Sequence, residues 1–191
     1  MATYIGSSTL TSSTYTASGS SLGVSGNLAI TGNVSISGQP AFNARGTGGW
    51  IYNSSFTGAD NWNEINSAVG WVVNQQGAGS YGFSTSTGRY TAPITGKYYF
   101  HASTHYYNDS NATSNYIHWL FGVNGSPSWN VGSTPYNIYA HGEVANYADG
   151  INVSGVISLS QGDYVSLRPY WAGSSGRLYG YYTLFCGHLI M

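Results

Sequence analysis

The sequence predicts an all-β protein, and two observations carry the prediction. Short segments rich in Val, Ile, Tyr, Phe and Trp alternate with clusters of Gly, Asn, Ser and Pro, which is the pattern of strands joined by turns. No segment shows the apolar period and the caps of an amphipathic helix. The number and spacing of the segments favour a sandwich or jelly roll. Strands are expected at residues 68–74, 81–91, 97–107, 116–123, 136–147, 151–159, 163–170 and 178–190.

The composition is that of a folded chain with an unusually uncharged surface. Of the 191 residues, 41% are hydrophobic and 16% aromatic, which is enough to form a core. Only 6% are charged, against roughly a quarter in an average soluble protein, so Ser, Thr, Asn and Gly must supply the solubility. A net charge of −1 with scattered Lys and Arg argues against nucleic acid as a partner. No apolar run is long enough for membrane insertion, and the first residues lack the features of a secretory signal.

Residues 1–40 differ in composition from the rest of the chain, because they are rich in Ser, Thr and Gly and contain no charged residue. From Leu22 onward the apolar residues fall on even positions, and Gly26, Gly32 and Gly38 recur every six residues. A repeat this short cannot bury its apolar stripe alone, whereas three copies wound about one axis can. We therefore expect an N-terminal attachment segment and a Gly-punctuated β stalk, with a flexible Ser/Gly tether as the alternative.

The segment of residues 88–100 is the most specific in the chain. It predicts a strand that ends at Pro93, a tight turn through Gly96 and then a second strand. Because side chains alternate along a strand, Tyr98 and Phe100 are expected on one face of that second strand.

This segment resembles the globular head of complement C-one-q, within the tumour-necrosis-factor-like jelly-roll superfamily, which has an aromatic residue, Ala-Pro, Gly and alternating aromatics in this arrangement. Residues 159–165 are similar to the family's Gly-Asp turn, and residues 185–190 to its closing strand. Residues 41–42 match its first strand, and Asn74 stands where the family often has Asn before a Gly-containing turn. The resemblance covers residues 41–191 and implies a head of about ten strands. It also implies a homotrimer formed through one face of the inner sheet.

The chain departs from this family at its N-terminus. Complement heads are secreted on collagen stalks, whereas this chain has a six-residue Gly-Asn-apolar repeat and no secretory signal. Repeats of this kind are similar to those of phage fibres and other virion proteins. We therefore expect a protein that is made in a host cytoplasm and carried on the surface of a bacteriophage-type virion, with residues 1–40 binding other virion proteins.

Signatures of catalysis are weak. Residues 19–23 match a Gly-x-Ser-x-Gly nucleophile elbow by letters alone, because no strand-to-helix turn is predicted there. The six acidic residues form no convincing general acid–base pair, and Asp163 is expected to serve in a turn. The sequence therefore predicts a protein that is not an enzyme.

The histidines and the single cysteine lead us to expect no metal site and no cofactor. His101 and His105 alternate onto one face of a strand, and His118 could approach from the next strand, but no Cys or acid completes a ligand set. We interpret these imidazoles as polar groups of a hydrated interface, with a metal at a three-fold axis as the alternative. Cys186 lies in an apolar stretch and is expected to be buried and inert.

Aromatic residues beside Ser, Gly and Asn are the best functional signal. Rigid rings with adaptable hydrogen-bonding neighbours suit carbohydrates, whose apolar faces stack on rings while their hydroxyls meet polar groups. Packing in the core or between subunits is the alternative for each of these residues. The candidate ligand-binding residues are Tyr106, Tyr107, Trp129, Tyr136, Trp171, Arg177 and Tyr179.

Three functions are compatible with these observations. The first is a virion fibre or receptor-binding head that attaches to host-surface glycan, where three weak sites on one trimer gain by avidity. The second is a structural capsid or baseplate decoration protein, in which residues 1–40 hold the particle and the head only projects. The third, a non-viral trimeric adhesin, is disfavoured by the missing signal.

Overall fold

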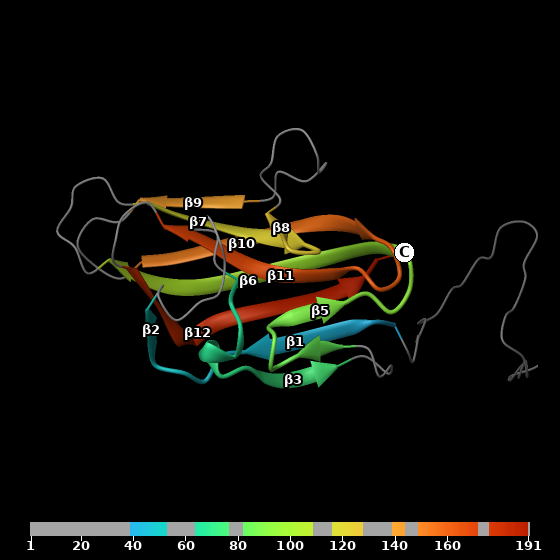
Figure 1. The fold of residues 1–191 in the computed structure, drawn as a ribbon, viewed down its shortest axis with the longest axis horizontal. Coiled ribbons are helices and arrows are strands. Elements are labelled where there is room, and N and C mark those ends of the chain that lie inside the picture. The colour runs from blue at the N-terminus through green and yellow to red at the C-terminus, as the bar shows by residue number, and fades with distance from the viewer. Residues whose placement is uncertain are drawn as a thin grey trace, which may run out of the picture. The chain divides into compact units, whose positions relative to one another are not determined.

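A computed structural model of the protein describes residues 39–52, 64–76, 82–108, 116–127, 139–143, 149–171 and 176–190. These residues form twelve strands and one turn of 3-10 helix (Figure 1), so the predicted all-β class is confirmed. No helix within the described ranges is long and apolar enough to span a membrane. The chain divides into two compact units, Met1–Ser35 and Ile36–Met191. The predicted stalk at residues 1–40 lies outside the described residues except for its last two.

Two antiparallel sheets make up the head. The first sheet has the order β10-β6-β12-β1-β3, with β2 pairing on β12, and the second has the order β4-β5-β11-β7-β8, with β9 pairing on β7. The strands of the first sheet are β10 (Asp149–Leu159), β6 (Gly96–Asn108), β12 (Gly176–Leu189), β1 (Ala41–Arg45), β3 (Val72–Gln76) and β2 (Trp50–Tyr52). The strands of the second sheet are β4 (Phe83–Ser84), β5 (Arg89–Thr91), β11 (Tyr164–Trp171), β7 (Tyr116–Val123), β8 (Ser126–Pro127) and β9 (Tyr139–Glu143).

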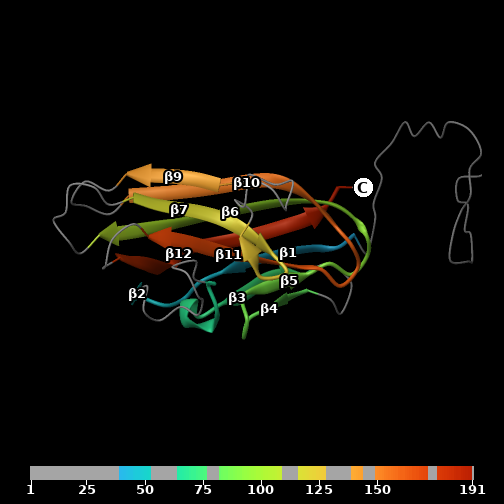
Figure 2. The ribbon, with the colours of Figure 1, turned by 45° about the horizontal axis from the view of Figure 1, so that its top comes forward.

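The sheets pack face to face, as in a jelly-roll sandwich. The axes of their long strands are nearly aligned, with neighbouring strands running in opposite directions, and β9 of the second sheet lies beside β10 of the first (Figure 2). The first and last strands of the head are neighbours, because β1 pairs with β12. The backbone N–H of Leu189 accordingly donates to the carbonyl of Pro40 over 2.8 Å. Residues 1–38 therefore join the head at the end of the first sheet where β12 finishes.

The predicted long strands are confirmed. The structure has β6, β7, β10, β11 and β12 where the sequence predicted strands, with ends that differ by at most two residues. Strand β1 begins at Ala41, as the resemblance implied. Of the strand predicted at residues 136–147, β9 is present, and the flanking residues lie outside the description.

Two predicted strands were wrong in part, and two short strands were missed. Residues 81–91 form two strands, β4 and β5, because a turn closes with the N–H of Gly88 donating to the carbonyl of Ser84 over 2.8 Å. The segment 68–74 opens as the 3-10 turn Ser67–Val69, where the Asn66 side chain accepts from the N–H of Ala68 over 2.9 Å. Strands β2 and β8 have only three and two residues, too few to show an alternating pattern.

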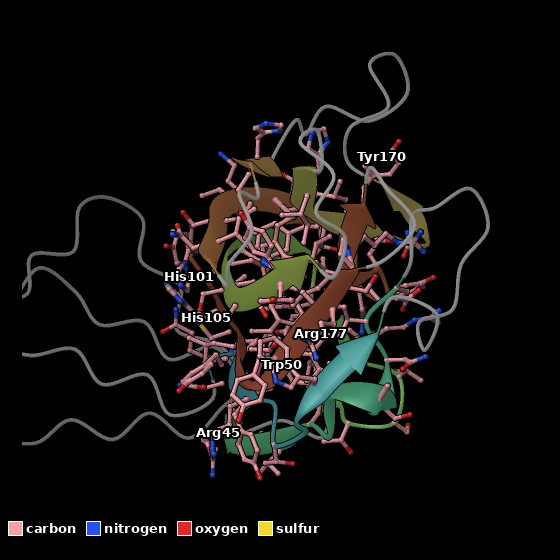
Figure 3. The ribbon with its side chains drawn as sticks, turned by 90° about the vertical axis from the view of Figure 1, so that its left-hand side faces the viewer. Arg45, Trp50, His101, His105, Tyr170 and Arg177 are labelled. Carbon is pink, nitrogen blue, oxygen red and sulfur yellow. The ribbon has the colours of Figure 1, made fainter. Side chains whose placement is uncertain are left out.

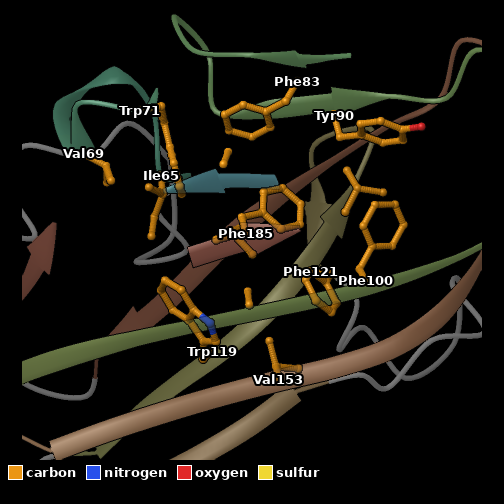
Figure 4. Close-up of a cluster of buried hydrophobic side chains, with 14 of the residues drawn as sticks. Ile65, Val69, Trp71, Phe83, Tyr90, Phe100, Trp119, Phe121, Val153 and Phe185 are labelled. Carbon is orange, nitrogen blue, oxygen red and sulfur yellow. The ribbon is translucent and has the colours of Figure 1, made fainter. Parts of the chain in front are cut away.

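Aromatic rings from both sheets fill the core (Figure 4). Alternation along β6 points Tyr98 and Phe100 inward, and both are fully buried, as predicted. Phe42 of the first sheet stacks on Tyr90 of the second with ring centroids 4.6 Å apart, and it meets the edge of Phe185 at 4.8 Å. The stacked contact between Phe42 and Tyr90 joins the inner faces of the two sheets, while the edge contact with Phe185 packs neighbouring strands of the first sheet.

The closing strand needs a glycine opposite Phe100. Gly187 on β12 pairs directly with Phe100 on β6, and the ring lies over the glycine. A Cβ atom at Gly187 would come within 2.5 Å of Phe100 Cδ1 and 2.9 Å of the carbonyl oxygen of Tyr99. Both distances are shorter than van der Waals contact, so the aromatic-x-Gly pattern of residues 185–187 has a steric cause.

Two of the segments that carried the resemblance lie against each other. The N–H of Ala92 donates to the carbonyl of Asp163 over 2.8 Å, and the N–H of Gly162 donates to the carbonyl of Ala92 over 2.9 Å. The Asp163 carboxylate accepts from the N–H of Ser160 at 2.7 Å and from the amide of Asn124 at 2.8 Å. The prediction that Asp163 serves in a turn is therefore confirmed.

The buried carboxylate of Glu64 fixes the segment that precedes the 3-10 turn to the second sheet. Glu64, 6% exposed, accepts from Arg89 over 2.5 Å and from Arg168 over 3.2 Å. The Arg89 guanidinium also lies 4.2 Å from the ring centroid of Tyr164. The hydrogen bond from Glu64 raises the pKa of Arg89. These contacts give Glu64 a structural role.

We expect the substitution Gly187→Ala to destabilise the head, because the added methyl group overlaps Phe100 and the Tyr99 carbonyl. Overpacking of this kind costs about 1–3 kcal/mol of unfolding free energy, which urea denaturation would measure. The matched control is Gly150→Ala on β10, where a Cβ would meet the His105 ring at an ordinary 3.7 Å. Equal losses for the two variants would contradict this account.

Candidate functional site

Aromatic side chains gather on the outer face of the first sheet, at the end opposite to Pro40. We call this group the aromatic cluster; it comprises Trp50, His105, Tyr107, Arg177, Tyr179, Tyr181 and Tyr182. Its members come from three adjacent strands, β2, the last residues of β6 and the first residues of β12. The cluster therefore lies at the far end of the head from the point where residues 1–38 join it.

A bulge in β12 creates the cluster. Tyr179 pairs with His105, but Leu184, five residues later, pairs with Ser103, only two residues away on β6. Residues 180–183 thus stand opposite a single residue of β6, which bends the strand and interrupts its alternation.

A buried hydrogen bond holds the bulge on the inner face of the first sheet, and two tyrosines lie on the outer face. Inside, the hydroxyls of Thr104 and Thr183 are buried and lie 2.8 Å apart. Outside, Tyr181 and Tyr182 are each 56% exposed. The ring of Tyr182 lies 4.6 Å from that of His105. Large aromatic surface is therefore held in solvent on a rigid part of the sheet.

Glycines bring Trp50 to the bulge. The N–H of Gly180 donates to the carbonyl of Gly49 over 2.8 Å. A Cβ at Gly180 would lie only 2.5 Å from the oxygen of Gly48, so only glycine permits this approach of two backbones. Trp50 follows directly, and its ring lies 4.7 Å from that of Tyr179.

Arg177 lies between two aromatic rings. Its guanidinium carbon is 4.6 Å from the ring centroid of Trp50 and 4.5 Å from that of Tyr107, while the two rings are 5.8 Å apart. Figure 3 looks onto this end of the head and shows Trp50 and Arg177 beside each other. Contacts of a cation with two ring faces hold the planar guanidinium in one orientation.

An open cavity of about 280 Å³ adjoins the cluster. Hydroxyl, amide, imidazole and phenol groups surround it; the lining residues are Ser103, Thr104, His105, Gly150, Ile151, Asn152 and Tyr182. The cluster and the cavity together offer ring faces, a fixed cation and hydrogen-bonding groups. This combination suits recognition of a polar ligand with apolar faces.

The structure brings three of the predicted binding residues together in the aromatic cluster and shows that a fourth is buried in the core. Tyr107, Arg177 and Tyr179 all belong to the aromatic cluster. Tyr106 was a wrong prediction, because its side chain is 1% exposed and points into the core. Its hydroxyl reaches the second sheet, where a Cβ at Gly142 would lie 2.5 Å from it.

The other candidates lie elsewhere or outside the described residues. Trp129 and Tyr136 are outside the described residues. Trp171 ends β11 in the second sheet, and its side chain is likewise outside the description. Sequence analysis missed Trp50, although it follows Gly46–Gly49 in the chain and is 41% exposed. The criterion used for Trp129, an aromatic residue in a small-residue segment, would also have selected Trp50.

The histidines are arranged differently from the prediction. His101 and His105 do share one face of β6, as expected, and Figure 3 shows them along the same side of the head. His118 does not approach them, because it lies on β7 in the second sheet, opposite His141. Cys186 pairs with His101 on the outer face of the first sheet and is only half-buried, so the expectation that it is buried was wrong. Burial nevertheless raises the pKa of the Cys186 thiol, which lowers its reactivity.

The strand order and the two sheets define a jelly roll of the tumour-necrosis-factor and complement type. Solved structures with this fold include Eiger TNF from S. frugiperda, with a TM-score of 0.56 and 12% identity over 81% of this chain and 94% of that one. The globular domain of zebrafish complement 1qA protein matches with a TM-score of 0.51 and 22% identity, over 80% of this chain and 98% of that one. Murine APRIL at pH 5.0 matches with a TM-score of 0.51 and 11% identity, over 80% and 99%. No protein-family model and no curated protein matches the chain. The fold that the sequence resemblance implied is thus confirmed.

We expect Arg177→Gln to lower the unfolding free energy by about 1–2 kcal/mol, because two cation–π contacts are lost. Thermal unfolding followed by circular dichroism would measure the change. Arg45→Gln is the control, since Arg45 is exposed and its guanidinium makes a long hydrogen bond of 3.4 Å to the Asn74 side chain. A loss as large for Arg45→Gln would mean that the ring contacts of Arg177 contribute nothing.

Proposed function

We propose that this chain is a homotrimeric binding protein of a virion surface, and that its head attaches to host-surface glycan through the aromatic cluster. The observation that carries the proposal is the wedging of Arg177 between Trp50 and Tyr107 beside exposed tyrosines. Ring faces stack on the apolar faces of sugars, and the guanidinium and neighbouring amides bind hydroxyl or carboxylate groups. The role is binding rather than catalysis.

Trimer formation is supported by the outer face of the first sheet. Below the aromatic cluster, side chains that alternate with the core residues leave apolar groups at the surface, including Val156, which is 44% exposed, and half-buried Tyr99 and Leu184. The resemblance implies a trimer formed through one face of the inner sheet, and we assign that role to the part of this face below the aromatic cluster. Second and third copies of the chain would cover that part and leave the cluster itself uncovered.

The position of the cluster within the head fits attachment. Pro40, where the described chain enters the head, bonds to Leu189, and the aromatic cluster lies at the other end of β6 and β12. The cluster is therefore far from the point at which the chain enters the head. The virion setting is supported by the sparse charge and by the six-residue repeats of residues 1–40.

Val156→Asp is expected to convert the trimer to folded monomers, because it puts a charge into the apolar interface. Sedimentation equilibrium of the full chain measures the mass. Ile94→Asp is the control, since Ile94 is 47% exposed in the turn between β5 and β6, away from the sheet face. A wild-type monomer would contradict the proposed trimer.

Adsorption of the purified full chain to candidate host bacteria, and competition with virus for them, tests the attachment function. We expect Trp50→Ala to reduce adsorption at least tenfold, because the loss at each of three sites compounds through avidity. Tyr170→Ala removes an aromatic residue of the second sheet and should leave adsorption unchanged. A well-folded wild-type trimer that does not adsorb would refute attachment and favour the decoration role.

A further inference from the structure

Two histidines converge on the outer face of the second sheet, apart from the aromatic cluster. His118 on β7 and His141 on β9 stand directly opposite each other in the antiparallel register. Nε2 of His118 lies 3.0 Å from Nδ1 of His141, so one nitrogen donates a hydrogen bond and the other accepts it. Two imidazole nitrogens from neighbouring strands thus face each other at hydrogen-bond distance.

We propose that His118 and His141 form a binding site for a divalent transition-metal ion. A metal–imidazole bond is about 2.0–2.1 Å long. Two nitrogens on one ion, separated by between a right angle and the tetrahedral angle, are therefore about 2.9–3.4 Å apart. The observed 3.0 Å falls in this range. The ring centroids are 5.1 Å apart, so the two nitrogens face each other nearly head-on and both rings turn when an ion replaces the hydrogen bond.

The backbone holds one ligand firmly and leaves the other accessible. Strand β7 is paired on both sides, with β9 and with β11, and the neighbours of His118 in the chain, Ile117 and Trp119, are fully buried. His118 itself is half-buried, whereas His141 is exposed. Because the two paired strands already hold the histidines together, little ordering is needed when an ion binds. The exposed side of His141 leaves the site open to solvent.

The nitrogens that face each other are the ones that would bind the ion. A neutral imidazole binds a metal through one ring nitrogen and carries its proton on the other. His118 therefore coordinates through Nε2 and His141 through Nδ1.

The ligand set favours particular ions. In the ranges that the structure describes, no three or more His, Cys, Asp or Glu side chains group around one point. The described residues therefore supply two imidazoles, which leaves the other coordination positions of the ion open. Tyr170, opposite His118 on β11, has its ring 5.7 Å from the His118 ring and borders the site. Imidazole ligands select Ni²⁺, Cu²⁺ and Zn²⁺ over Ca²⁺ and Mg²⁺.

Calorimetric titration of the untagged full chain with Ni²⁺ near neutral pH tests the site. Ni²⁺ binds imidazole well and, unlike Cu²⁺, does not oxidise the free Cys186. We expect one ion per chain, and His141→Gln should raise the Kd at least tenfold. Because His141 is exposed, this variant should fold normally. His118→Gln should weaken binding as much, and the double variant no further than either single one.

His101→Gln is the matched control, since it removes an imidazole from the other sheet. It should leave the Ni²⁺ affinity unchanged. A chain that binds no Ni²⁺, or whose binding survives His141→Gln, overturns the proposal. A loss of affinity in His101→Gln equal to that in His141→Gln also overturns it, and would show that the first sheet contributes to the Ni²⁺ site. A melting temperature that Ni²⁺ raises in the wild type but not in His141→Gln would support the site independently.

Discussion

The contact between Phe100 and Gly187 is the constraint on which the rest of the head depends. Strands β6 and β12 are neighbours in the middle of the first sheet, and the absence of a side chain at Gly187 leaves room for the Phe100 ring. That ring then reaches Phe121 of the second sheet, with centroids 5.8 Å apart. The two sheets can therefore share one aromatic core, and the shorter strands add to a centre that is already packed.

The bulge in β12 adds exposed aromatic residues to a strand that also fills the core. From Leu184 onward, alternate residues of β12 fill the core, and the register with β6 is regular. Before the bulge, Leu178 is in the core while its neighbours Arg177 and Tyr179 belong to the aromatic cluster. The extra residues free Tyr181 and Tyr182 from the alternation, while the buried bond between Thr104 and Thr183 keeps the bulge attached to β6. A rigid scaffold thus carries an exposed aromatic surface without exposing its core.

Sequence patterns predicted the long strands because an alternating apolar face repeats often enough along them to be recognised. Short strands such as β2 carry too few residues for any period, and they form only because a neighbouring strand is present. The same limit applies to the site. Composition selected both Tyr106 and Tyr107, but adjacent residues of a strand face opposite ways, so one is in the core and the other in the aromatic cluster. Trp50 met the local criterion that selected Trp129, but only the structure shows that it contacts Tyr107, Arg177 and Tyr179, which lie far away in the chain.

By itself, the sequence determined the all-β class, the positions of the long strands and the turns around Pro93 and Asp163. These depend on local alternation and on residues with special backbone preferences, which are visible in a short window. The tertiary structure decided which distant residues meet. It placed Arg177 between Trp50 and Tyr107, and it put His118 beside His141 in the second sheet rather than beside His101 in the first. Strand order and register decide such pairings, and both arise from packing of the whole chain, which no local pattern encodes.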